Sequence, residues 1–154
     1  MIQRKQTLYL FFAVICFILT TFLPLGSVEI AGMGVPDTIT SLGLKDGDNG
    51  NMSYPFFAIP MFFLTMNVFY AIAIIFMYRN RKAQALNCYI LILAVVIEMI
   101  ACGVLIMQTC IDEGQTFHAG TAISLPIVAM IFILLAHHGI MADEKLIKSI
   151  DRIR

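Results

Sequence analysis

Residues 86–107 read LNCYILILAVVIEMIACGVLIM, an apolar run whose only charged residue is Glu98. A helix needs about 20 residues to cross the hydrocarbon core of a bilayer, and this run supplies them. Because lipid offers the backbone no hydrogen-bond partners, the segment must satisfy its own N–H and C=O groups, as a helix does. Three more charge-poor runs lie at residues 8–25, 54–78 and 119–140. The sequence therefore predicts an all-α membrane protein with a bundle of four transmembrane helices.

The composition excludes an ordinary soluble domain. Of the 154 residues, 60% are hydrophobic and only 13% are charged, and the mean hydropathy is +0.88. A soluble domain of this size needs a charged, solvated surface, which so few charged residues cannot build. We therefore expect one integral membrane domain over residues 1–154, with the lipid bilayer as its partner. The net charge of zero gives no general attraction to nucleic acid, and none is expected to bind.

Basic residues predict the orientation of the bundle, because cytoplasmic connections carry an excess of Lys and Arg. All but Lys45 of the ten Lys and Arg residues fall before the first run, between the second and third runs, or after the fourth. These residues are Arg4, Lys5, Arg79, Arg81, Lys82, Lys145, Lys148, Arg152 and Arg154. Both termini are therefore expected in the cytoplasm. The first run is longer than the core of about 7–15 residues typical of a signal peptide, so we expect it to remain a span.

Two connecting segments carry their own structural signals. The outer loop, residues 26–53, contains the β-prone stretches 28–30 and 38–40 with turn residues between them, which can form a small β-hairpin. Its segment 46–51, DGDNGN, resembles the start of a calcium loop but lacks Gly at the sixth position and Glu at the twelfth, so a plain turn is expected. The cytoplasmic tail, residues 141–154, carries apolar and charged residues at helical spacing, which predicts a short amphipathic helix. This helix either continues from the fourth span or folds onto the membrane surface.

Glu98 is the most informative polar residue of the predicted spans. A charged side chain at the centre of a bilayer costs about 2.5–3.5 kcal/mol on insertion scales, so such a residue usually faces the bundle interior. Asn67 and Thr65 lie at nearly the same depth in the second run, and either can bond the carboxyl. Two interpretations remain open for this group of three. It forms a structural interhelical hydrogen bond, or Glu98 carries a proton or ion.

Other residues carry weaker signals. Pro60 and Pro126 fall inside predicted helices, where proline tends to kink a span. His137 and His138 end the fourth run at the cytoplasmic side, and adjacent helical residues point about 100° apart, so they are expected to lie at the interface and not to share a metal. His118 lies beside Asp112 and Glu113 in a short outer loop, without a diagnostic metal-site spacing.

No catalytic motif accompanies the spans. The sequence has no HExxH, no glycine-rich phosphate loop and no pair of intramembrane carboxylates, so we expect no enzyme activity and no cofactor or metal. Cys102 and Cys110 are the one pair that an oxidoreductase could use near the outer face. Eight positions along one helix separate them by about 12 Å, too far for a disulfide unless the helix ends between them.

The two ends of the sequence carry a resemblance. The start, MIQRKQTLYL at residues 1–10, and the tail, DEKLIKSIDRIR at residues 143–154, resemble those of a family of four-span membrane proteins from Bacteroidetes known as domain of unknown function 4293. The length and the four-span layout are similar throughout. The resemblance implies a multi-pass protein of the bacterial inner membrane, and it implies no activity.

These observations lead to two hypotheses for function. The first is a non-enzymatic accessory or scaffold component of the membrane, which acts through a membrane-protein partner or a homo-oligomer. The second is a small proton- or ion-coupled transporter. A chain of four spans is small for enclosing a pathway, so transport through Glu98 requires an oligomer.

Overall fold

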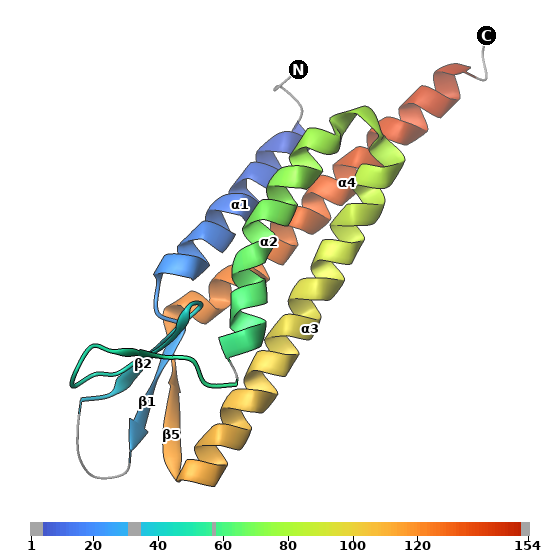
Figure 1. The fold of residues 1–154 in the computed structure, drawn as a ribbon. Helices are drawn as coiled ribbons and strands as arrows, with labels where there is room; N and C mark the ends of the chain where they lie inside the picture. The colour runs from blue at the N-terminus through green and yellow to red at the C-terminus, as the bar shows by residue number, and fades with distance from the viewer. Residues whose placement is uncertain (1–4, 31–34, 57, 152–154) are drawn as a thin grey trace.

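The computed structural model describes residues 5–30, 35–56 and 58–151. It contains a bundle of four long helices with a small β-sheet at one end (Figure 1). The helices are α1 (Lys5–Phe22), α2 (Ala58–Phe76), α3 (Arg81–Glu113) and α4 (Leu125–Asp151), with short 3₁₀ turns η1 (Met77–Arg79) and η2 (Thr121–Ser124). The strands are β1 (Gly26–Ile30), β2 (Asp37–Thr40), β3 (Gly43–Lys45), β4 (Met52–Ser53) and β5 (Gln115–Ala119). The prediction of a mainly helical bundle is confirmed, but the all-α class is wrong because of the sheet.

The four helices pack in a ring, with α1 against α2 and α4 and with α3 against the same two neighbours. One stripe of each helix faces the core, which includes Leu10, Phe17, Leu91 and Ile133, none of them exposed. The outward stripes are equally apolar, as in the lipid-facing helices of a membrane protein. The helices are therefore hydrophobic on all sides, and burial alone distinguishes the core from the outer surface.

Three helical segments are long and apolar enough to cross a membrane: Ala58–Arg79, Arg81–Gln108 and Thr121–Lys145. The described part of α1, Gln6–Phe22, is apolar but shorter. These segments agree with three of the four predicted spans. They make the chain compatible with a membrane protein by length and composition.

Helix α3 extends beyond the predicted run of residues 86–107 at both ends. Asn80 caps its start, where the side-chain oxygen accepts a hydrogen bond of 3.2 Å from the Ala83 N–H. Gly114 ends it in the left-handed conformation, at φ 64°, which glycine adopts without strain. Hydropathy missed both ends because capping depends on single polar residues and not on apolarity.

The sheet has the order β4-β3-β2-β1-β5 and is antiparallel throughout. The predicted hairpin in the outer loop corresponds to β1 and β2, with Gly26 opposite Ile39. Strand β5 comes from the other connection and pairs with β1 along its whole length, from Gly26 opposite Ala119 to Ile30 opposite Gln115. The sheet thus ties both connections at this end of the bundle into one layer. We call this end the sheet end, and the opposite end, where η1 joins α2 to α3, the turn end.

The two prolines lie in the first turns of their helices, not in the helix interiors where the sequence placed them. Pro60 is the third residue of α2, and Pro126 is the second residue of α4. The first N–H groups of a helix have no intrahelical acceptor, so proline costs nothing there and starts the helix. The fourth predicted span, residues 119–140, was likewise misplaced at its start, since Ala119 ends β5 and η2 precedes α4.

The predicted amphipathic tail is part of α4, which runs without a break to Asp151. The segment is therefore a continuation of the fourth long helix and not a separate element. Residues 152–154, which belong to the resemblance at the end of the sequence, lie outside the described residues, as do residues 1–4 at its start.

Candidate functional site

Asn67 and Glu98 meet at the middle of the bundle. Asn67 is the central residue of α2, and Glu98 lies next to the centre of α3. The Asn67 Nδ2 group donates a hydrogen bond of 2.5 Å to Glu98 Oε2. Asn67 is 6% exposed, so its amide has left solvent and gains from a partner that accepts. The contact that matching depths predicted between these two helices is present.

Thr65 does not join this pair. Its Oγ1 atom is buried without a hydrogen-bond partner. Residues two positions apart on a helix point about 200° apart, so the face that brings Asn67 to α3 turns Thr65 away from it. The expectation that Thr65 could hold the Glu98 carboxyl is wrong, and Asn67 alone takes that role among the described residues.

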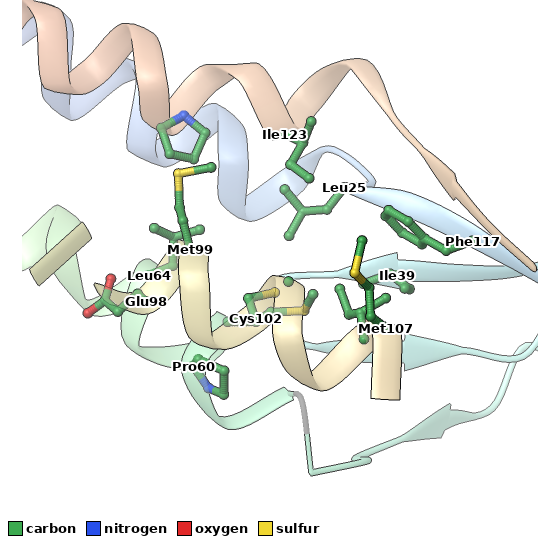
Figure 2. Close-up of a pocket in the computed structure, with 14 residues that line it drawn as sticks. Leu25, Ile39, Pro60, Leu64, Glu98, Met99, Cys102, Met107, Phe117 and Ile123 are labelled. Atoms are coloured by element: carbon green, nitrogen blue, oxygen red, sulfur yellow. The ribbon is translucent and has the colours of Figure 1, made fainter. Parts of the chain in front are cut away.

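Glu98 lies at one end of a cavity of about 240 Å³ (Figure 2). Helices α2, α3 and the start of α4 form its walls, and the sheet closes it. Apart from Glu98 its lining is nonpolar. The other lining residues are Leu25, Ile39, Pro60, Met61, Leu64, Met99, Cys102, Gly103, Ile106, Met107, Phe117, Ile123 and Pro126. Pro60 and Pro126, which lie in the first turns of α2 and α4, both line it.

The cavity has a buried side and an exposed side. Ile39 on β2 and Met61 on α2 are 0% and 1% exposed and form its buried side. Met107 on α3 is 69% exposed and Ile123 on η2 is 36% exposed. Gly103, one turn from Met107 on α3, is exposed as well. The cavity therefore opens between α3 and the segment that leads into α4.

Cys102 and Cys110 do not lie close enough for a disulfide. Because α3 continues without a break from Arg81 to Glu113, Cys102 and Cys110 lie in one helix, about 12 Å apart along its axis. A disulfide needs Cα atoms within about 7 Å. The geometry excludes this bridge, and Cys102 instead contributes its side chain to the cavity wall.

The histidines lie in different surroundings. The His137 ring on α4 packs on Tyr89 of α3, with ring centroids 4.0 Å apart, near the turn end. His118 on β5 lies 3.7 Å from Glu29 on β1, and both side chains are more than half exposed. Glu29 is thus a cross-strand acid beside His118, and the side chains of Asp112 and Glu113, its neighbours in the sequence, lie outside the described residues. Over residues 5–30, 35–56 and 58–151, no three metal-binding side chains gather.

The calcium-like segment is a turn, as predicted. Asp46 accepts hydrogen bonds from the Asp48 N–H at 2.9 Å and from the Asn49 side chain at 3.2 Å. These bonds favour the charged carboxylate, and they lower the pKa of Asp46 from its usual value, with the Asp48 N–H as the larger cause. The Asp46 carboxylate thus serves to organise its own turn.

A second polar group near the turn end was not predicted. Tyr70 on α2 donates a hydrogen bond of 2.5 Å to Asn87 Oδ1 on α3, and the Gln84 side chain donates one of 3.1 Å to the Ile74 carbonyl. Both bonds join α2 to α3 close to η1. Asn87 inside an apolar run was the available signal, because an amide in a span needs a partner.

Comparisons with known proteins give a family and no activity. No curated protein and no solved structure matches the chain. A family model matches residues 2–153, which is nearly the whole sequence. The resemblance seen at the two ends is therefore confirmed: the chain belongs to the family described as Domain of unknown function (DUF4293).

Proposed function

We propose that this chain is a four-span protein of the bacterial inner membrane that acts as a non-enzymatic accessory component. Three helices already have the length and apolarity of spans. Helix α1 packs extensively along α4, so it shares the depth of a candidate span. Its 18 residues cover about 27 Å, close to the thickness of the hydrocarbon core.

The distribution of charge supports cytoplasmic termini. Arg79, Arg81 and Lys82 lie at the turn end, where α1 begins and α4 ends (Figure 1). The sheet end carries Glu29, Asp37, Asp46 and Asp48, with Lys45 as the exception among its strands. Basic connections remain in the cytoplasm, so the turn end is inside and the sheet is outside.

The sheet is the observation that carries the accessory role. Strands from two connections, β1 and β5, pair over five positions and make one layer at the outer end of the bundle. Backbone pairing of this kind gives a rigid surface instead of two separate loops. Such a surface, held beside the bilayer, suits contact with the outer part of another membrane protein or of a second copy.

Photo-crosslinking in native membranes tests this role. A photoreactive residue replaces His118 or Lys45 on the sheet, and in the control it replaces Tyr78, which is exposed at the turn end. We expect an adduct of one discrete mass from the sheet positions and none from Tyr78. The adduct is identified by mass spectrometry and checked by purification through the partner. Recovery of the chain alone, with no adduct from either sheet position, rejects the proposal.

A second candidate function is proton- or ion-coupled transport by an oligomer. The observation in its favour is that Glu98 lines a cavity at mid-length of the bundle. A carboxyl in that position can bind and release a proton if water reaches it. Glu98→Gln keeps the shape of the side chain but cannot titrate. Equal proton flux into liposomes with the wild type and with Glu98→Gln eliminates transport.

A further inference from the structure

The cavity is larger than a packing defect. An apolar cavity of about 150 Å³ in a soluble protein stays dry and binds benzene. This cavity measures about 240 Å³ and has a comparable lining of Leu, Ile, Met and Phe side chains. Water has too few polar partners there, whereas a nonpolar occupant gains dispersion contacts with the walls. The lining therefore selects hydrocarbon.

The shape of the cavity favours an extended acyl chain as its ligand over a compact ring compound. Its lining on α3 runs from Glu98 to Met107, which spans about 13 Å at the rise of an α-helix. Glu98 lies at the end remote from the sheet, and Ile39 and Phe117 lie at the other end (Figure 2). The cavity is thus elongated along the helix axis, in the direction that lipid chains take in a bilayer.

The deep end offers no site for a charged group. Glu98 Oε2 accepts its hydrogen bond from Asn67, which is a neutral amide. Neither residue supplies a positive charge. A fatty-acid carboxylate placed there would meet another carboxyl and no cation. The end of the occupant that approaches Glu98 is therefore a methyl group, and any polar headgroup stays outside the cavity.

The position of the opening indicates that the acyl chain enters from the bilayer. Gly103, Met107 and Ile123 form it between α3 and η2, and all three are exposed and nonpolar. They lie within two of the segments that can cross a membrane, Arg81–Gln108 and Thr121–Lys145. An opening at that depth faces lipid chains and not water.

We infer that this cavity, between α3 and the start of α4, binds one acyl chain of a phospholipid from the leaflet on the sheet side. The inference rests on the membrane embedding proposed above, but not on the accessory or transport role. The chain enters with its methyl end toward Glu98, and the headgroup remains at the membrane surface beside the sheet. The bound chain fills the space that separates the sheet-end halves of α3 and α4.

A matched pair of variants tests the inference. Gly103 lines the cavity, and a Cβ atom added there meets nothing within 4 Å, so Gly103→Leu adds bulk at the cavity without a clash at Cβ. Val104, the next residue, is 58% exposed and does not line the cavity, so Val104→Leu is the control for added bulk. Each protein is reconstituted in phosphatidylethanolamine vesicles that contain a phospholipid with a diazirine near the end of one acyl chain.

After irradiation, labelled peptides are mapped by mass spectrometry. We expect labels on Met99, Cys102 or Ile106 in the wild type and in Val104→Leu, and at least about a fivefold loss of these labels in Gly103→Leu. Equal labelling of the three proteins overturns the inference. A loss of labelling in both variants also overturns it, because bulk on the lipid-facing side should not matter. Gel filtration verifies that both variants are monodisperse, and Gly103→Ala, which adds one methyl group, replaces Gly103→Leu if that variant aggregates.

Two further experiments identify the class of the bound lipid and separate the lipid site from the proposed functions. Native mass spectrometry of the protein from mild detergent should show one bound phospholipid, while a neutral isoprenoid or quinone of defined mass in its place overturns the assignment to phospholipid. Labelling should be unchanged in Glu98→Gln. If transport fails in liposomes while labelling persists, the proposed transport falls and the lipid site stands. If labelling fails while the sheet crosslinks to a partner, the lipid site falls and the proposed accessory role stands.

Discussion

Gln6 Nε2 on α1 donates a hydrogen bond of 2.6 Å to Asp143 Oδ2 on α4, across 137 positions of sequence. Gln6 is 8% exposed, and its side chain lies against Gly139, one turn before Asp143. A Cβ atom at Gly139 would lie 2.8 Å from Gln6 Cγ, which is too close for contact. This glycine therefore lets α1 and α4 approach closely enough for the polar contact at the turn end.

The first prediction compares two glycines. Gly139→Ala should destabilise the bundle by about 1–3 kcal/mol, because the new methyl group forces Gln6 or the helix to move. Gly103→Ala should not destabilise it, because its methyl group meets nothing within 4 Å and alanine favours helix. Thermal unfolding in detergent, followed by circular dichroism, measures both. Equal midpoints for the two variants would show that the close approach at Gly139 is not required.

The second prediction concerns Asn67. Asn67→Leu removes the donor to Glu98 and should lower the free energy of unfolding by about 0.6–2 kcal/mol, the range for polar contacts between transmembrane helices. Glu98→Gln should cost less, because the Gln carbonyl still accepts from Asn67. The double variant Asn67→Leu/Glu98→Leu leaves no unpaired polar group, so it should be more stable than Asn67→Leu alone. Additive losses in this double-mutant cycle would contradict a direct interaction.

The third prediction tests orientation. In a variant whose four native cysteines are replaced by alanine, Asp48→Cys in the turn between β3 and β4 should react with a membrane-impermeant maleimide in intact cells. Lys82→Cys at the turn end should react only after permeabilisation, because basic connections stay inside. The two positions are each other's controls. Labelling of Lys82→Cys in intact cells, with Asp48→Cys protected, reverses the proposed topology.

The fourth prediction concerns pH at the outer turn. The bonds from the Asp48 N–H and the Asn49 amide lower the pKa of Asp46 in the folded state. The contribution of Asp46 to the turn is therefore present above its unfolded pKa of about 3.9 and is lost as pH falls through the lower folded value. Carboxyl titration by NMR in micelles should give a pKa for Asp46 below 3.8, the ordinary value for Asp.

A matched substitution separates charge from geometry at this turn. Asp46→Asn keeps an oxygen that can accept from the Asp48 N–H but cannot titrate. The part of the pH-dependent change in the Asp48 amide shift that follows the Asp46 carboxyl in the wild type should then be lost. An Asp46 midpoint at or above 3.8 in the wild type would show that the turn does not favour the carboxylate.

Features that depend on neighbouring residues were predictable. The hairpin of β1 and β2 lies within 15 residues of sequence, and its β-prone stretches were visible with turn residues between them. The contact of Asn67 with Glu98 followed from depth in two helices that succeed each other. The choice between Asn67 and Thr65 did not follow, because it depends on how α2 is rotated about its axis, and an apolar surface on all sides leaves that rotation undefined.

Features that join distant segments were not predictable. Strand β5, Gln115–Ala119, has no strong apolar alternation, and its partner β1 precedes it by more than 80 positions. Pro60 and Pro126 were misread because hydropathy runs extend past the points where helices begin. The cavity needed all of these elements in place, since its walls come from α2, α3, η2, α4 and the sheet.

The sequence by itself determined the family and three of the helices that are long and apolar enough to span a membrane. Such helices are visible in the sequence because the cost of placing a residue in lipid or water is local and sums along the chain. Only the tertiary structure decided that the two connections at the sheet end form one sheet, that Asn67 and not Thr65 holds Glu98, and that a hydrocarbon-lined cavity lies between α3 and the start of α4. Strand register and side-chain packing depend on atoms brought together from distant positions. Among helices that are apolar on every face, those contacts follow from shape, which hydropathy does not encode.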